Sequence, residues 1–156
     1  MAAAAPQPVV IVLAAQATGM AASGRGWHAE GAAEPLIRLW CNCDQRLVEG
    51  GARVHRLEEE AAWLAWWEGA AGLGSAVTTA LALQAEVEAF RVRLPIAVAL
   101  RIGIGVGPAP ISLSVGPRVC GPTVALAERL AHSAPSGGIV IVPVPDGTAH
   151  QIPRST

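Results

Sequence analysis

The stretch LRIGIGVGP, residues 100–108, places Gly103, Gly105 and Gly107 at alternate positions of an apolar run. Glycines that cradle a dinucleotide phosphate leave a strand and open a helix. These glycines instead lie within or at the end of a predicted strand, residues 96–106, and prolines follow them. Glycine inside a strand is typical of a place that another backbone approaches closely. The stretch therefore predicts a buried strand with a close neighbour, and it argues against a cofactor loop.

The segments around this stretch alternate between apolar runs typical of strands and apolar residues at helical spacing. Residues 75–92 carry the strongest helical signal, because five apolar residues repeat on one face of a 3.6-residue period. Those five residues are Ala76, Ala80, Leu83, Val87 and Phe90. The other predicted helices are 35–49 and 123–133, and the predicted strands are 8–14, 53–57, 61–67, 96–106, 111–115 and 139–142.

In chain order these elements read β-α-β-β-α-β-β-α-β. The first six match the ferredoxin-like βαββαβ core, and a hairpin strand, a helix and a strand extend it. We therefore expect an α+β fold with one mixed sheet covered by helices, in which residues 111–115 pair with 96–106 across a Gly-Pro turn. The domain is expected to span residues 8–143, and residues 144–156 form a Pro-rich C-terminal tail.

Composition bounds the class of protein. The chain has 156 residues, enough for one domain with a substantial core. A hydrophobic content of 52%, a charged content of 15% and a net charge of −1 exclude a disordered chain and give no electrostatic reason to expect nucleic acid or a membrane surface as partner. All eleven basic residues are arginine, so chemistry that needs a lysine amine is excluded. No positive charge precedes the apolar run 9–15, which is also too short to span a membrane.

Simple metal and nucleophile motifs are weak in this sequence. The three cysteines are odd in number, and Cys41 and Cys43 have no second pair to complete a zinc site. We therefore expect free thiols in a reducing cytoplasm. The acidic run Glu58–Glu60 could bind a divalent cation or could simply be a solvated hairpin tip. The four histidines show no metal-binding spacing, and no serine lies in a G-x-S-x-G elbow.

Several short motifs in a fixed order resemble the class III adenylate/guanylate cyclase catalytic domain. Residues 100–108, 121–130 (GPTVALAERL) and 134–141 (APSGGIVI) are similar to the family's "lRiGIhtG", "GdtVNlAaRL" and "pGgivvs" segments. Upstream, residues 12–20 (VLAAQATGM) resemble "vLFaDivGFt", and residues 50–55 (GGARVH) resemble "GGrvvK". The resemblance spans residues 8–143 and implies the fold of that family, with its closing strands missing or reduced.

The resemblance also implies where the family's two metal-binding carboxylates would fall. They hold two Mg²⁺ ions against a nucleoside triphosphate. The first position falls on Gln16, whose neutral amide offers a metal one weak oxygen and no charge. The second falls on Glu59, which is one methylene longer than aspartate, and Mg²⁺ tolerates misplaced ligands poorly. The resemblance therefore predicts no metal site here.

The nucleotide-binding positions implied by the resemblance are also altered. The base-reading lysine falls on His55, and the second base-reading position falls on Arg118, which cannot accept a hydrogen bond. The ribose-orienting asparagine falls on Ala125. Only the arginine that stabilises the transferring phosphate is retained, as Arg129. His55, Arg118 and Arg129 remain the candidate nucleotide-binding residues, and Arg129 is the only candidate catalytic residue.

We therefore expect a cyclase-like domain that has lost catalysis and serves as a nucleotide-binding, regulatory or dimerisation module in cyclic nucleotide signalling. No cofactor is expected, and Mg²⁺ or Mn²⁺ would matter only with residual cyclase activity. The expected partner is a second copy or another cyclase-type domain, with a purine nucleotide as ligand. The alternatives are a half-partner that lends Arg129 to an intact cyclase, an active cyclase with unusual ligands, and an α+β domain unrelated to cyclases.

Overall fold

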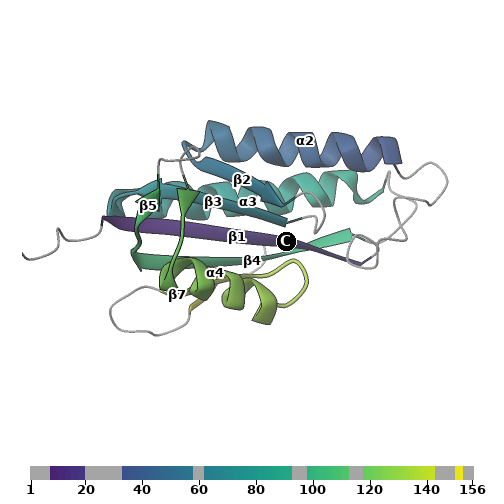
Figure 1. Ribbon diagram of the computed structural model, residues 1–156. Helices are drawn as coiled ribbons and strands as arrows, with labels where there is room; N and C mark the ends of the chain where they lie inside the picture. Colours follow the sequence, from purple (N-terminus) through teal and green to yellow (C-terminus); the bar gives the residue numbers. More distant parts are fainter. Residues whose placement is uncertain are drawn as a thin grey trace, which may run out of the picture.

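The computed structural model describes residues 8–19, 33–57, 62–92, 98–112, 118–142 and 150–152. Its main element is a six-stranded mixed sheet in the order β2-β3-β1-β4-β7-β8 (Figure 1). The strands of this sheet are β1 (Val9–Gly19), β2 (Arg53–Leu57), β3 (Ala62–Glu68), β4 (Val98–Pro108), β7 (Ile139–Val142) and β8 (His150–Ile152). β4 and β7 are parallel, whereas every other neighbouring pair is antiparallel.

Helices cover both faces of the sheet. α2 (Ala33–Glu49) and α3 (Leu73–Arg91), which the short 3₁₀ helix η3 (Ala70–Gly72) precedes, lie over one face (Figure 1). α4 (Pro122–Ser133) lies over the other. The three helices and the hairpin of β2 and β3 confirm the sequence predictions, as does the α+β fold class. Among the described residues, no helix is both long and apolar enough to cross a membrane.

The larger core lies between the sheet and the two helices α2 and α3. Alternate side chains of β1, such as Ile11 and Leu13, point into it and are fully buried. The five apolar positions predicted for the helix over residues 75–92 are buried there, and so are apolar residues of α2 at helical spacing: Leu36, Leu39, Trp40, Cys43 and Leu47. Trp40 meets Trp63 edge to face, with ring centroids 5.0 Å apart. This face of the sheet is therefore closed by packing.

The opposite face is closed by one helix at very short range. A side chain at Gly103 would collide with the backbone oxygen of Ala127 and the backbone nitrogen of Ala131, both in α4. At Gly105, an added Cβ would lie only 3.1 Å from the backbone oxygen of Thr123. The glycines of β4 are therefore the surface on which α4 rests, which confirms the close approach predicted from the sequence.

Three details of the sheet differ from the sequence predictions. β5 (Ile111–Ser112) pairs with β6 (Arg118–Val119) in a separate two-stranded sheet, so the predicted pairing of 111–115 with 96–106 is wrong. β4 has no free edge for it, because β1 and β7 occupy both sides. β1 also runs on to Gly19, beyond the predicted strand 8–14, because it pairs with β4 along its whole length. Finally, the segment predicted as a tail contributes β8, which pairs with β7.

Candidate functional site

Gln16 lies near the C-terminal end of β1, on the sheet face that α4 covers. Strand side chains alternate between faces, and Val10, Val12 and Ala14 pack in the cluster beneath α4. Gln16 continues that series and is half-buried. Its Cα is paired with those of Ala62 in β3 and Arg101 in β4. The position where the resemblance places a metal carboxylate therefore lies at the edge of the α4 layer.

The side chain of Gln16 is bound to α4. Its Oε1 lies 3.2 Å from Nδ1 of His132, an exposed residue in the last turn of the helix. An amide oxygen is only an acceptor, so this hydrogen bond requires a proton on Nδ1 of His132. The one oxygen that Gln16 could offer a metal faces this N–H group, which occupies one of its two lone pairs.

Arg101 lies on the same sheet face, directly across the strand pair from Gln16. Its Nη1 is 3.5 Å from the backbone oxygen of His132, one of the carbonyls that a helix end leaves without an intrahelical partner. Its Nε is buried and has no hydrogen-bond partner among the residues that the structure describes. No sequence motif indicated a role for Arg101 or His132. The antiparallel register of β1 and β4 places Arg101 beside Gln16, and the length of α4 brings His132 to it.

Ala125 and Arg129 occupy the solvent side of α4. Both residues are exposed, whereas Val124, Ala127 and Ala131 face the sheet. Arg129 precedes His132 by three residues, a spacing that makes two side chains neighbours on a helix surface. The retained arginine, Arg129, is therefore on the solvent-exposed surface of α4 and not in the core.

Among the predicted site residues whose side chains the structure describes, His55 does not join this cluster. His55 is exposed on β2 and shares the sheet face of Gln16, but it pairs with Leu64, one strand away from β1. Ordinary strand and residue spacings place its Cα about 12 Å from that of Gln16. Glu59 lies outside the described residues. Gln16, His55 and Arg129 therefore lie apart from one another on the side of the sheet that α4 covers.

Arg118 is described only through its backbone, which pairs with Ser112 in the β5–β6 hairpin. That hairpin is anchored where β4 ends and β1 begins, since the amide of Ala109 donates to the oxygen of Pro8. Gln16 lies near the other end of β1, at a distance of about 20 Å from its start. The backbone of Arg118 and the side chain of Gln16 therefore belong to opposite ends of the sheet.

The residues described around Gln16 do not fit a divalent cation. Mg²⁺ needs oxygen ligands in near-octahedral geometry and favours carboxylates. Here the amide oxygen of Gln16 faces an imidazole N–H, and the neighbour across the strand pair is a guanidinium. Within the described ranges, no three His, Cys, Asp or Glu side chains are grouped so that they could hold a metal ion.

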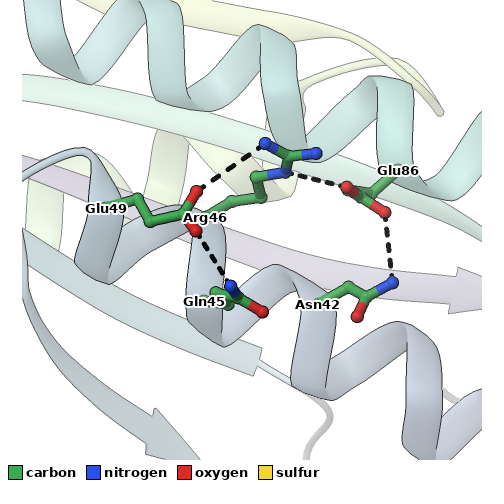
Figure 2. A pocket seen from close by; sticks show the side chains of 5 residues that line it. All are labelled: Asn42, Gln45, Arg46, Glu49 and Glu86. Atoms are coloured by element: carbon green, nitrogen blue, oxygen red, sulfur yellow. Dashed lines mark hydrogen bonds and ion pairs between the residues drawn. The ribbon is translucent and has the colours of Figure 1, made fainter.

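A surface pocket of about 180 Å³ lies on the opposite side of the molecule, between α2 and α3 (Figure 2). Its polar side chains are occupied with one another: Arg46 Nε lies 2.8 Å from Glu86 Oε1, and Asn42 Nδ2 lies 3.4 Å from Glu86 Oε2. Gln45 and Arg46 both contact Glu49. The hydrogen bond to Glu86 raises the pKa of Arg46, with their charge attraction adding to it. This network ties the two helices together and leaves little for a ligand.

The cysteines form no reactive pair. Burial raises the pKa of the Cys43 thiol to about 12, and the charges of Glu86 and Asp44 act in the same direction. A thiol with such a pKa is protonated near neutrality and is a poor nucleophile or metal ligand. Cys41 and Cys120 are exposed, and all three thiols are free.

Solved structures share this fold. The catalytic core of a rhodopsin-guanylyl cyclase with converted specificity, in complex with ATPαS, is 20% identical with a TM-score of 0.75, covering 92% of this chain and 80% of that chain. The monomeric guanylyl cyclase domain of the RhoGC fusion protein from the aquatic fungus Blastocladiella emersonii is 19% identical with a TM-score of 0.73, covering 88% and 82%. The adenylyl cyclase CyaB from P. aeruginosa is 16% identical with a TM-score of 0.70, covering 87% and 77%.

The chain therefore has the fold of the adenylyl and guanylyl cyclase catalytic domains. This is the class III cyclase-like fold that the sequence motifs indicated, and it extends over 87% to 92% of the chain in these three comparisons. No protein-family model and no curated protein sequence matches this chain.

Proposed function

We propose that this chain is a cyclase-like domain without cyclase catalysis, which serves as a nucleotide-binding and dimerisation module in cyclic nucleotide signalling. The observation that carries this proposal is the hydrogen bond between Gln16 and His132, beside Arg101. Two-metal chemistry neutralises the leaving pyrophosphate and activates the attacking hydroxyl. The described side chains of this cluster are an amide, an imidazole and a guanidinium, and none of them is a carboxylate that could hold those two metal ions.

A purine nucleotide is the proposed ligand. One structural neighbour binds an ATP analogue, and this chain keeps basic side chains at two of the matching positions, His55 and Arg129. Both are exposed and therefore free to meet an anionic ligand. We propose a second copy or another cyclase-type domain as partner, since a dimeric guanylyl cyclase domain is among the neighbours. The free cysteines support a cytoplasmic location as part of this proposal.

The test is a titration of the purified chain with ATP, GTP, cAMP and cGMP, with and without Mn²⁺. The unfolding midpoint reports binding, because a ligand that binds only the folded state raises it. Cyclic product and released pyrophosphate report turnover. A raised midpoint without product is the expected result, and replacing His55 or Arg129 by alanine should reduce the shift.

Cyclic product that depends on Gln16 would contradict the proposal, because it would mean that this residue supports catalysis. An unchanged midpoint with all four nucleotides would remove the nucleotide from the proposal and leave dimerisation. Sedimentation velocity of the same sample then decides whether the chain self-associates.

A second function is favoured by the position of Arg129 on the solvent side of α4. From there it could reach across an interface into the site of an intact cyclase partner. Mixing the chain with an active cyclase domain tests this: activity should rise, and Arg129→Ala should abolish the rise. No change in the partner's activity would exclude this function.

A further inference from the structure

We infer that the open edge of β2, together with the flank of α2 above it, pairs antiparallel with the same surface of a second copy of this chain. β2 is the outer strand of the six-stranded sheet, and its only neighbour among the described strands is β3. An edge strand presents a row of backbone N–H and C=O groups that no strand has paired. A second strand added at this edge would complete those hydrogen bonds.

α2 lies along this edge and turns an apolar flank toward it. The helix contacts β2, and its Asp44 accepts a hydrogen bond from Trp63 of β3, so the helix lies over the β2–β3 pair (Figure 1). Arg46 faces the other way, toward α3. Ile37 and Val48 are nine residues before and two residues after Arg46, which places both about half a turn around the helix from it. Both side chains therefore project over the open edge of the sheet.

The two apolar side chains are exposed to solvent. Ile37 is 55% exposed and Val48 is 64% exposed, whereas most other exposed residues of α2 are polar or charged. A single exposed apolar residue is ordinary on a protein surface. Here two of them lie on the same flank of one helix, beside unpaired backbone groups of an edge strand. This combination of backbone hydrogen-bonding groups and apolar contacts is typical of a surface that accepts another strand.

The geometry selects a second copy of the chain as the occupant. Two antiparallel copies of β2 would be related by a twofold axis close to His55, at the centre of the strand. His55 lies about 7 Å from the start of β2, and the same distance back along α2 from Glu49 reaches about as far as Asp44. Ile37 and Val48 lie on either side of that point. The twofold axis would therefore bring Ile37 of each copy toward Val48 of the other.

The two copies of α2 would lie at packing distance. Adjacent strands are about 4.8 Å apart, so a helix over the β2–β3 pair lies about 5 Å from the joint between the copies. The two helices would then run antiparallel at about 10 Å, the upper end of the range for packed helices. A strand of five residues and a helix of seventeen give an interface of roughly 800 Å² in total. This area is small for a specific complex, so the dimer should be weak.

The charges near β2 permit this pairing. β2 carries Arg53 and Arg56, and like charges on an edge strand oppose the pairing of two copies. The acidic run Glu58–Glu60 follows β2 directly in the sequence and lies outside the described residues. The segment 53–60 is therefore basic in its first half and acidic in its second half. Such a pattern favours antiparallel pairing of the segment with itself.

The inference deepens the proposed function, because it names the surface through which a second copy would bind. The experiment is sedimentation velocity of the full chain from about 10 to about 500 µM, over which a weak dimer should replace the monomer. Ile37→Asp and Val48→Asp should each weaken the association at least about tenfold, because each substitution removes an apolar contact twice in a twofold interface. Val92→Asp is the matched control at the end of α3, where the side chain is 91% exposed, and it should associate as the native chain does.

Hydrogen exchange of the same samples locates the contact. The β2 amides that face the open edge should exchange more slowly at high than at low protein concentration, because strand pairing protects them. The amides of β1 are the internal reference, since β1 is paired on both sides in the single chain. Their exchange should not depend on protein concentration.

A chain that stays monomeric throughout the series would overturn both this inference and the dimerisation part of the proposed function. A dimer that is unchanged in Ile37→Asp and Val48→Asp, or that leaves the exchange of β2 unchanged, would overturn this inference alone. Equal weakening by Val92→Asp would also overturn it, because the association would then not be specific to this edge. Nucleotide binding is measured by the unfolding midpoint and is judged separately.

Discussion

The two faces of the central sheet differ in the helices that cover them and in the side chains that they carry. On the face covered by α2 and α3, a large apolar cluster that includes Trp40 and Trp63 is closed by two helices, and the polar groups above it bond one another. The other face is covered by α4, which rests on the glycines of β4. Polar side chains gather where that cover ends, at Gln16, Arg101 and His132.

This difference bears on the proposed function, because it separates the residues that stabilise the fold from the residues around Gln16. Stability comes mainly from the side with two helices, where burial is extensive. The side chains at the C-terminal end of β1 lie at the margin of the smaller cluster. The presence of Gln16 in place of a carboxylate therefore disturbs little packing. Substitutions on the two faces should therefore differ in their effects on stability and on ligand binding.

Trp40→Ala is expected to have the largest effect on stability. The side chain is 2% exposed and packs edge to face on Trp63. Removing a buried aromatic of this size costs about 3–5 kcal/mol of the free energy of unfolding. Urea unfolding followed by circular dichroism measures it, with Leu81→Ala, a more exposed site on α3, as the control. Equal losses for the two variants would contradict the assignment of the main core to this face.

Gly103→Ala tests the opposite face by adding one methyl group. The new Cβ would meet backbone atoms of Ala127 and Ala131, which cannot move without displacing α4. Overpacking of this kind costs about 1–3 kcal/mol. Gly74→Ala, in α3 with no atom within 4 Å of the added Cβ, is the matched control and should stabilise slightly. A neutral Gly103→Ala would mean that α4 does not rest on β4.

Alkaline pH should destabilise the folded chain through Cys43. Burial raises its pKa from 9.0 to about 12, so between these values the unfolded state releases a proton that the folded state keeps. The free energy of unfolding should therefore be unaffected by this group below pH 9 and fall by up to about 1.4 kcal/mol per pH unit above it. The chain has no lysine or tyrosine to titrate in this range.

Chemical unfolding at a series of pH values between 8 and about 11 measures this slope. Cys43→Ala, compared with the exposed Cys41→Ala, provides the control. Loss of the slope in Cys43→Ala alone is the expected result. An equal slope in both variants would assign the pH dependence to another group.

Gln16→Asp is expected to have the smallest effect on stability. The new carboxylate would lie beside Arg101 and His132 and pair with them, which adds about 1 kcal/mol or less for a partly exposed ion pair. Thermal unfolding measures this effect, with Gln16→Ala as the control that removes the hydrogen bond to His132 without adding a charge. A Gln16→Asp variant that is less stable than Gln16→Ala would contradict the pairing with Arg101 and His132.

Much of the fold was predictable because its signals are local. The apolar faces of α2 and α3 followed from helical periodicity, and the glycines of β4 indicated the close approach of α4. The pairing of β5 was not predictable in this way, because it depends on which strands already occupy the edges of β4. β8 was missed because a three-residue strand in a Pro-rich segment carries no periodicity.

The site was predictable only in part, for the same reason. The position of Gln16 could be predicted from the sequence, because it lies within one short segment that resembles a family motif. The contact with His132 joins residues 116 positions apart, and no sequence pattern links them. Arg101 was visible within a recognised motif, but its place opposite Gln16 follows from strand register alone. The neighbours of Gln16, which are Arg101 and His132, are therefore set by the tertiary structure and not by a local sequence pattern.

The central claim is that the end of β1 does not bind a divalent cation, and a titration with Mn²⁺ followed by electron paramagnetic resonance tests it most directly. The signal of free Mn²⁺ disappears when the ion is bound by protein. We predict that the native chain leaves the signal of free Mn²⁺ undiminished. When ATP is present, the signal should equal that of Mn²⁺ and ATP without protein. A saturable loss of signal that Gln16→Ala abolishes would contradict the account.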